Sequence, residues 1–218
     1  MLSYSSTSED APLQHLQAQL LKLGLDIFQP FCSQHYNSGT PPTGLPLPSF
    51  GRACTLALLI GNTRALWPCF VAHLRQNPGC LDREHPLDDY VTAGLTSAVA
   101  SAALGQSETR LGHTFPGPVG FVDLLRAAHV SGLAFHNDDC HLCIHPTVGP
   151  WFGLRAVLIL DFDGSRYAGR EPCPGQPASC VGGGLRSTIT CPPHHSKAAS
   201  TTCASRIDGN HHACDAQA

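Results

Sequence analysis

Charged residues are scarce in this chain of 218 residues, where Asp, Glu, Lys and Arg together make up 13%. The formal net charge is −3, so the sequence lacks the basic field that collects phosphate backbones, and no nucleic-acid partner is expected. It also lacks an apolar run of about 18 residues, the signature of a membrane-spanning helix. Its N-terminus lacks the basic and apolar regions of a secretory signal. We therefore expect a soluble, cytoplasmic protein that does not bind membranes.

Several catalytic motifs are missing as well. The sequence contains no GxSxG nucleophile elbow, no P-loop and no GxGxxG dinucleotide pattern. The glycines at 181–185 (VGGGL) are not followed by an expected helix, so they do not form a phosphate-binding turn. These absences exclude the common hydrolase, NTPase and dinucleotide-binding classes.

Cysteine, in contrast, is abundant, with 11 residues. Because no secretory signal is expected, we interpret the compartment as reducing rather than as one that builds a disulfide framework. Five cysteines lie in the C-terminal region, and none of them is spaced as C-x2-C from another. Zinc and iron–sulfur sites commonly show such close pairs, so we expect no metal site there.

Apolar spacing predicts four helices and two buried strands. The helices are expected around residues 12–23, 66–74, 87–104 and 122–132, and the strands over 54–62 and 151–162. The segment 25–48 is rich in Pro, Gly, Asn and Ser and is expected to be a loop. This mixture indicates an α+β or α/β domain.

The composition changes after residue 163, where Gly, Pro, Ser, Thr, Cys and His replace the periodic apolar pattern. We therefore expect one domain over residues 1–163 and a disordered tail over residues 164–218.

Two polar residues stand where apolar neighbours predict burial. His129 lies on the apolar face of the fourth expected helix, and Arg155 lies at the start of the second expected strand. A buried imidazole needs a hydrogen-bond partner or a ligand, and a buried guanidinium needs an anion or several carbonyl oxygens. Cys143 could add a thiolate, although buried cysteines are more often inert. Together His129 and Arg155 favour a ligand with a polar head group. The acidic pairs 88–89 and 138–139 more simply mark a helix start or a solvated loop.

Three segments resemble one known family. They are CIHPTVGPWFGLRAVLIL at 143–160, RAAHVSGLAF at 126–135 and FQPFCSQHYNSGTPPTGLPLP at 28–48. In their order and spacing they are similar to the CblC family of cobalamin-processing proteins, which act as cyanocobalamin decyanases and alkylcobalamin dealkylases. The resemblance implies an α+β fold of the flavin-reductase or nitroreductase type, with a mixed sheet and flanking helices around a cobalamin whose lower base is detached.

The resemblance also implies site residues. Arg155 matches an arginine that holds a glutathione carboxylate, and no residue is assigned as catalytic. The positions that match cobalamin-binding residues are Val122, Asp123, Leu124, Leu125, His129, His136, Asn137, Asp138, Cys143 and Leu154. The implied cofactors are glutathione and a reduced flavin, FMN or FAD, with cobalamin as the substrate. The implied partners are a trafficking protein of the CblD type and a second copy of the chain in a ligand-induced homodimer.

Two alternatives remain beside this reading. One is an iron–sulfur cobamide protein like the epoxyqueuosine reductases, which would use the C-terminal cysteines as cluster ligands. The other is a non-catalytic cobalamin carrier or adaptor, expected if the chain cannot bind a thiol. Dealkylation with glutathione would separate an enzyme from a carrier.

Overall fold

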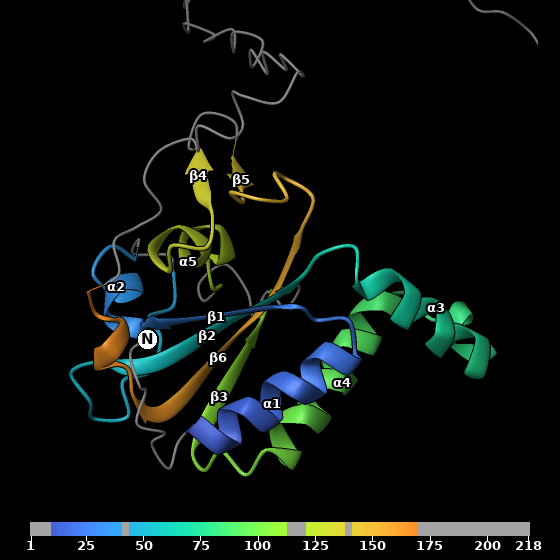
Figure 1. Cartoon of the computed structure of the whole chain (residues 1–218), viewed down its shortest axis with the longest axis horizontal. Helices are drawn as coiled ribbons and strands as arrows, with labels where there is room; N and C mark the ends of the chain where they lie inside the picture. The colour runs from blue at the N-terminus through green and yellow to red at the C-terminus, as the bar shows by residue number, and fades with distance from the viewer. Residues whose placement is uncertain (1–9, 41–43, 113–120, 138–140, 170–218) are drawn as a thin grey trace, which may run out of the picture. The chain divides into compact units, whose positions relative to one another are not determined.

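The computed structural model describes residues 10–40, 44–112, 121–137 and 141–169. Helices and strands alternate irregularly along this part of the chain, as an α+β fold requires (Figure 1). The α-helices are α1 (Asp10–Lys22), α2 (Ser33–Asn37), α3 (Leu66–Gln76), α4 (Pro86–Ser101) and α5 (Leu124–Val130). The strands are β1 (Ile27–Cys32), β2 (Thr55–Asn62), β3 (Ser107–Leu111), β4 (Phe135–Asn137), β5 (Leu142–Ile144) and β6 (Gly153–Asp163), and two 3-10 helices, η1 (Pro78–Asp82) and η2 (Ser165–Tyr167), complete the elements.

The main sheet has four strands in the order β1-β2-β6-β3, and each neighbouring pair is antiparallel. The expectation of a mixed sheet was therefore wrong for these strands. Continuous apolar strands such as β2 and β6 are typical of parallel sheets because both of their faces are buried. Here both faces are buried as well, since helices cover the sheet on both sides, so the apolar pattern does not reveal strand direction.

Two hydrophobic cores lie on opposite faces of this sheet. On β2, Leu56, Leu58 and Ile60 pack into one core with α1 and α4, while Ala57 and Leu59 pack into the other with α5. Figure 1 shows α1 and α4 on one side of the sheet and α2 and α5 on the other. This alternation is the period of two that a strand imposes on its side chains.

The expected helices and both expected strands are present, with shifted ends. The fourth helix begins later than expected, at Leu124, because Asp123 is its N-cap. The segment 25–48 is not simply a loop, since it contains β1 and α2. Pro30 is tolerated in β1 because that strand lies at the edge of the sheet.

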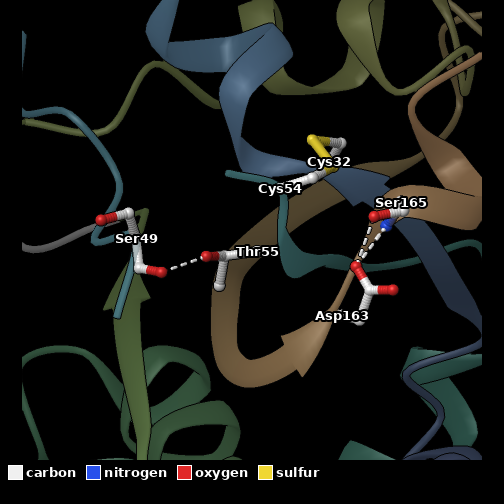
Figure 2. Close-up of a disulfide and its surroundings, with 6 residues drawn as sticks. All are labelled: Cys32, Ser49, Cys54, Thr55, Asp163 and Ser165. Carbon is white, nitrogen blue, oxygen red and sulfur yellow. Dashed lines mark hydrogen bonds between the residues drawn. A yellow bond between two sulfur atoms is a disulfide. The ribbon is translucent and has the colours of Figure 1, made fainter. Parts of the chain in front are cut away.

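A disulfide joins Cys32 and Cys54, whose Cα atoms are 5.5 Å apart (Figure 2). It connects the N-cap position of α2 to the residue before β2. Next to it, the Thr55 hydroxyl donates to the carbonyl oxygen of Ser49 at 2.5 Å. This cysteine pair is bonded, so it does not follow the expectation of reduced thiols.

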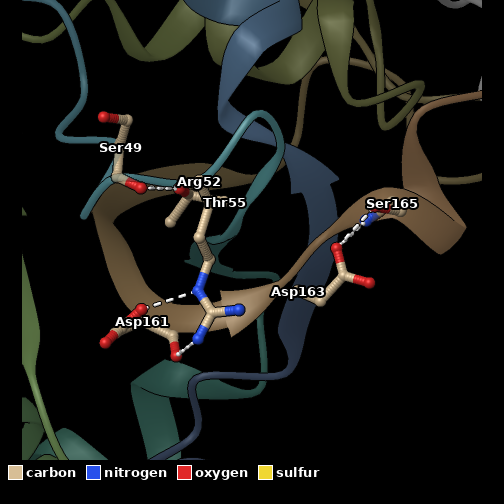
Figure 3. Close-up of polar contacts among 6 residues, drawn as sticks. All are labelled: Ser49, Arg52, Thr55, Asp161, Asp163 and Ser165. Carbon is tan, nitrogen blue, oxygen red and sulfur yellow. Dashed lines mark hydrogen bonds and ion pairs between the residues drawn. The ribbon is translucent and has the colours of Figure 1, made fainter.

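The far end of β6 carries its own polar contacts (Figure 3). Arg52 Nε donates to the Asp161 carboxylate at 2.6 Å, and Arg52 Nη2 donates to the Asp161 carbonyl at 2.9 Å. Asp163 accepts from the N–H and the hydroxyl of Ser165, and these hydrogen bonds lower the pKa of Asp163. Beyond position 163, Tyr167 still packs against the core of α1 and α4.

Within the described residues, no helix combines the length and the apolar character needed to cross a bilayer.

Candidate functional site

Helix α5 supplies one wall of the candidate site. Asp123 caps this helix, because its carboxylate accepts a hydrogen bond from the Arg126 N–H at 2.9 Å. The residues between them, Leu124 and Leu125, are partly buried and pack against the core on this face of the sheet. The cap therefore fixes the start of the helix at the position where its two leucines face the site.

Helix α2 also contacts the N-terminal end of α5 and helps to hold it in place. Tyr36 is fully buried, and its hydroxyl accepts the Asp123 backbone N–H at 2.9 Å. Arg126 donates from Nε and Nη2 to the Tyr36 carbonyl at 3.2 and 3.1 Å. Gly39 leaves room for this guanidinium, since a Cβ there would lie 2.4 Å from Arg126 Nη2. Burial raises the pKa of Tyr36, so the phenol stays protonated at neutral pH.

The β4–β5 hairpin brings the other residues of the site together. Its register pairs His136 with Cys143 and Asn137 with Leu142. Cys143 is buried, and its thiol donates to the carbonyl oxygen of Leu125 on α5 at 3.5 Å. This contact connects the hairpin to α5.

A cavity of about 330 Å³ lies where α5, the hairpin and the start of β6 meet. Four predicted cobalamin-binding residues, Leu124, Leu125, Cys143 and Leu154, line it. The remaining lining residues are His141, Leu142, Pro150 and Phe152. The lining is mostly apolar, as is usual for sites that bury a small organic ligand.

The other predicted residues that the structure describes are not part of the cavity lining. His129 is in the last turn of α5, where its ring meets the edge of Phe135 at a centroid distance of 6.3 Å. Val122 is partly buried and packs against the hydrophobic core on the α5 side of the sheet. His136 and Asn137 are in β4, while Asp138 lies outside the described residues.

The Arg155 side chain is not part of the cavity lining. The reason is that β6 has one residue more than its neighbour β2 at this position, so that the strand bulges. Ile60 pairs with Ala156 and Gly61 pairs with Leu154, so Arg155 has no partner across the strand pair. An extra residue of this kind changes the direction of the side chains next to it. Leu154 consequently lines the cavity, whereas Arg155 contacts residues of β2 and α4.

The Arg155 guanidinium has two polar neighbours, an amide oxygen that accepts a hydrogen bond and a carboxylate of opposite charge. Its Nε donates to Asn62 Oδ1 at 2.7 Å, and its Nη1 lies 4.0 Å from an Asp88 carboxylate oxygen at the start of α4. Burial lowers the pKa of Arg155, and the Asp88 charge partly opposes this shift. The guanidinium remains charged at neutral pH in either case. The pair 88–89 thus marks a helix start, as expected.

Sequence reasoning missed residues of two kinds. Phe152 and Pro150 line the cavity and belong to the same segment as Leu154, so the segment itself was a usable signal. Tyr36 and Arg126 form the contact between α2 and α5, and nothing in the spacing of a region expected to be a loop indicated it.

Comparisons with known proteins find relatives of this chain. A zebrafish (Danio rerio) protein named cyanocobalamin reductase / alkylcobalamin dealkylase is 28% identical over 199 residues, which cover 83% of this chain and 75% of that protein. A bovine (Bos taurus) protein of the same name is 27% identical over 183 residues, covering 77% of this chain and 62% of the bovine protein. No protein-family model matches the chain.

A solved structure gives the same fold. The crystal structure of the C. elegans B12-trafficking protein CblC has a TM-score of 0.63 and is 20% identical, covering 79% of this chain and 77% of that chain. At 20% identity the structural match supports the fold alone. The evidence that this chain is related to the named proteins is the two sequence matches. Sequence and fold therefore agree: the chain is similar to two proteins named cyanocobalamin reductase / alkylcobalamin dealkylase and shares the fold of a CblC protein.

Proposed function

We propose that this protein binds cobalamin and removes its upper axial ligand. The observation that carries the proposal is the cavity lined by Leu124, Leu125, Cys143 and Leu154, which comes from three separate segments of the sequence. Each of these positions matches a cobalamin-binding position of the CblC family. Two relatives named cyanocobalamin reductase / alkylcobalamin dealkylase support the same activity.

The cavity suits one edge of a corrin ring. Its volume of about 330 Å³ is at the small end for organic ligands, so the macrocycle would extend beyond it. The apolar side chains would contact the ring face and exclude water from cobalt. We infer that Val122, Asp123, His129, His136, Asn137 and Asp138 contact or support the periphery of the macrocycle. In this role the protein selects the form of cobalamin in which the lower base is detached.

Dealkylation would use the glutathione thiolate as the nucleophile. Its sulfur attacks the alkyl carbon, the sulfur–carbon bond forms and the cobalt–carbon bond breaks. The electron pair of the broken bond stays on cobalt, giving cob(I)alamin and an alkyl thioether of glutathione. Arg155 would hold a carboxylate of glutathione through charge-assisted hydrogen bonds and so orient the thiol. To do so it would exchange part of its contact with Asp88 for the incoming carboxylate.

Decyanation would need an electron donor. One electron reduces cobalt from the +3 to the +2 state, and cyanide leaves. A reduced flavin, FMN or FAD, is the donor that the family resemblance implies. The described residues that line the cavity include no lysine or arginine to hold a flavin phosphate, so they do not fit a resident flavin. We therefore assign no step to a bound flavin.

The remaining implications of the resemblance are parts of the same proposal. We infer a flavin-reductase or nitroreductase type of fold, delivery of the product to a CblD-type protein, and pairing of two chains when cobalamin binds. A carrier function without catalysis is the second candidate. It is the function expected if the chain does not bind a thiol, and the existing contacts of Arg155 with Asn62 and Asp88 favour it because they already engage the guanidinium.

The test is anaerobic incubation of the full chain with methylcobalamin and then with glutathione. Formation of S-methylglutathione together with loss of the methylcobalamin spectrum is the expected result. Binding without thioether formation would contradict the dealkylase and support the carrier. Cyanocobalamin with reduced FMN, followed by cyanide release, tests the reductive reaction in the same way.

A further inference from the structure

The Cys32–Cys54 disulfide closes a loop of the chain that contains α2. Cys32 is 1% exposed and lies where β1 passes into α2, and its backbone pairs with Leu56 of β2. Cys54 is partly exposed and immediately precedes β2 (Figure 2). The bond therefore joins the two ends of the segment that leaves β1 and returns to β2.

The described residues between the two cysteines contact the start of α5 in two places. In α2, the Tyr36 hydroxyl accepts the backbone N–H of Asp123, the N-cap residue of α5, at 2.9 Å. Further along the chain, the Leu45 N–H donates to the carbonyl oxygen of Phe121 at 3.1 Å. The residues that follow in α5, at 124–125, line the candidate cobalamin cavity.

These two contacts belong to one structural unit. Asn37, the last residue of α2, donates from Nδ2 to the Leu47 carbonyl at 2.9 Å and accepts the Leu47 N–H at 2.7 Å. Tyr36 and Leu47 are both buried in the core on the α5 side of the sheet. A change that releases α2 would therefore also release the second contact with the start of α5.

The disulfide limits local unfolding of this unit. A closed loop has fewer open conformations than a free segment, so local unfolding is less favourable while the bond is intact. When the bond is broken, the open state gains conformational entropy and becomes more populated. In that open state Tyr36 and Leu45 no longer bind the start of α5.

We propose that the Cys32–Cys54 disulfide is a redox switch, which a low-molecular-weight thiol such as glutathione opens, and that its opening releases the start of α5. The thiolate attacks the sulfur of Cys54, the more exposed partner, and a new sulfur–sulfur bond forms as the bond to Cys32 breaks. The Cys32 sulfur takes the electron pair and then a proton from water. A second thiol attacks the reagent sulfur of this mixed disulfide, which releases Cys54 as a thiol. Two reagent molecules are oxidised to their disulfide, and the cysteine pair is reduced.

The test is hydrogen exchange of the full chain without cobalamin, measured by mass spectrometry. Protein equilibrated with glutathione disulfide is first mapped after alkylation, and free thiols at both Cys32 and Cys54 would overturn the proposal. Reduction with glutathione is then expected to speed exchange at least about tenfold in peptides covering α2 and residues 121–126. Peptides covering residues 156–160 of β6 should be unchanged. Unchanged exchange at 121–126, or equal acceleration in β6, would overturn the switch.

Two variants separate the bond from the reagent. Cys54→Ser removes the bond, leaves the buried Cys32 thiol in place and should show the fast exchange without any added thiol. Cys69→Ser replaces another partly exposed cysteine, keeps the bond and should exchange like the oxidised wild type. Brief treatment of the wild type with glutathione, followed by iodoacetamide, should place glutathione on Cys54 and the alkyl group on Cys32. The reverse labelling, or slow exchange in Cys54→Ser, would refute this mechanism.

The consequence for cobalamin rests on the proposed function. Release of the start of α5 lowers the fraction of chains with a complete cavity, so the apparent affinity falls with it. Absorbance titrations with cyanocobalamin, without flavin or thiol, should give an affinity about three- to tenfold weaker for Cys54→Ser than for Cys69→Ser. Equal affinities would contradict the link between the disulfide and the site. Absence of binding to every protein would contradict the proposed function, while the exchange rates would still decide the switch.

Discussion

Replacement of Arg155 by alanine should separate glutathione use from cobalamin binding. The guanidinium lies outside the lining of the candidate cobalamin cavity and contacts Asn62 and Asp88 instead. Its loss removes the proposed partner of a glutathione carboxylate but leaves the cavity side chains in place. We expect the Michaelis constant for glutathione to rise strongly and the affinity for methylcobalamin to change by less than about threefold.

The size of the effect follows from the contacts of Arg155. A hydrogen bond to a charged group contributes about 1.5–3 kcal/mol, which corresponds to roughly 10- to 150-fold in the Michaelis constant for glutathione. The variant also leaves Asn62 Oδ1 without this donor, and Asn62 is 8% exposed. An unsatisfied buried acceptor costs about 1–3 kcal/mol, so the free energy of unfolding should also fall.

The assay measures initial rates of methylcobalamin dealkylation against glutathione concentration, with cobalamin affinity measured separately by absorbance. Arg52→Ala is the matched control, since it removes an arginine bound to a β6 carboxylate at the other end of the strand (Figure 3). Arg155→Lys should give an intermediate value because it keeps the charge and loses the planar fork. Equal loss of glutathione use and cobalamin binding in Arg155→Ala, or equal effects of the two alanine variants, would refute the role of Arg155.

Four further predictions concern glutathione use, stability and cobalamin binding. Asp88→Asn should lower the Michaelis constant for glutathione about two- to fivefold because Asp88 competes for Arg155; an increase would contradict that competition. Tyr36→Phe should lower the free energy of unfolding in urea by about 1–2 kcal/mol, since the N–H of Asp123, the N-cap residue of α5, loses its acceptor; an unchanged value would contradict the importance of this contact. Gly61→Ala should cost about 1–3 kcal/mol, since its Cβ would lie 2.5 Å from a β6 carbonyl oxygen, whereas Gly79→Ala, with open space around it, should be neutral in the same melts. Deletion of residues 170–218 should leave methylcobalamin binding unchanged in an absorbance titration, and lost binding would place part of the pocket there.

The strongest sequence signals were long apolar patterns. The leucines at helical spacing in α1 and the unbroken apolar run of β2 identified the type of each element correctly. Strand direction was not readable, because helices cover both faces of β2 and hide the alternation that an antiparallel sheet often shows. β1 was missed because Pro30 and the segment rich in Pro, Gly, Asn and Ser that follows it resemble a loop, whereas an edge strand tolerates a proline.

The site was partly predictable, because some of its residues belong to a segment with a recognisable sequence pattern. Cys143 and Leu154 belong to the segment 143–160, which has the family pattern, and both line the same cavity. Arg155 matches the family's glutathione-binding arginine, but the sequence did not show that one extra residue in β6 directs its side chain toward Asn62. Such a bulge depends on the register with β2, which pairs residues far apart in the sequence. The role of Tyr36 was also not predictable from its local sequence, because its hydroxyl binds the start of α5, which lies far along the chain.

The most direct test of the central claim is an anaerobic absorbance titration of methylcobalamin with the purified full chain, monitored for detachment of the lower base. A working cobalamin site should give a saturable shift to the base-off spectrum. Leu154→Asp, which places a charge in the apolar lining of the cavity, should weaken the shift at least about tenfold. A spectrum that stays base-on at saturating protein would contradict a working cobalamin site, and an unchanged shift in Leu154→Asp would contradict its position in this cavity.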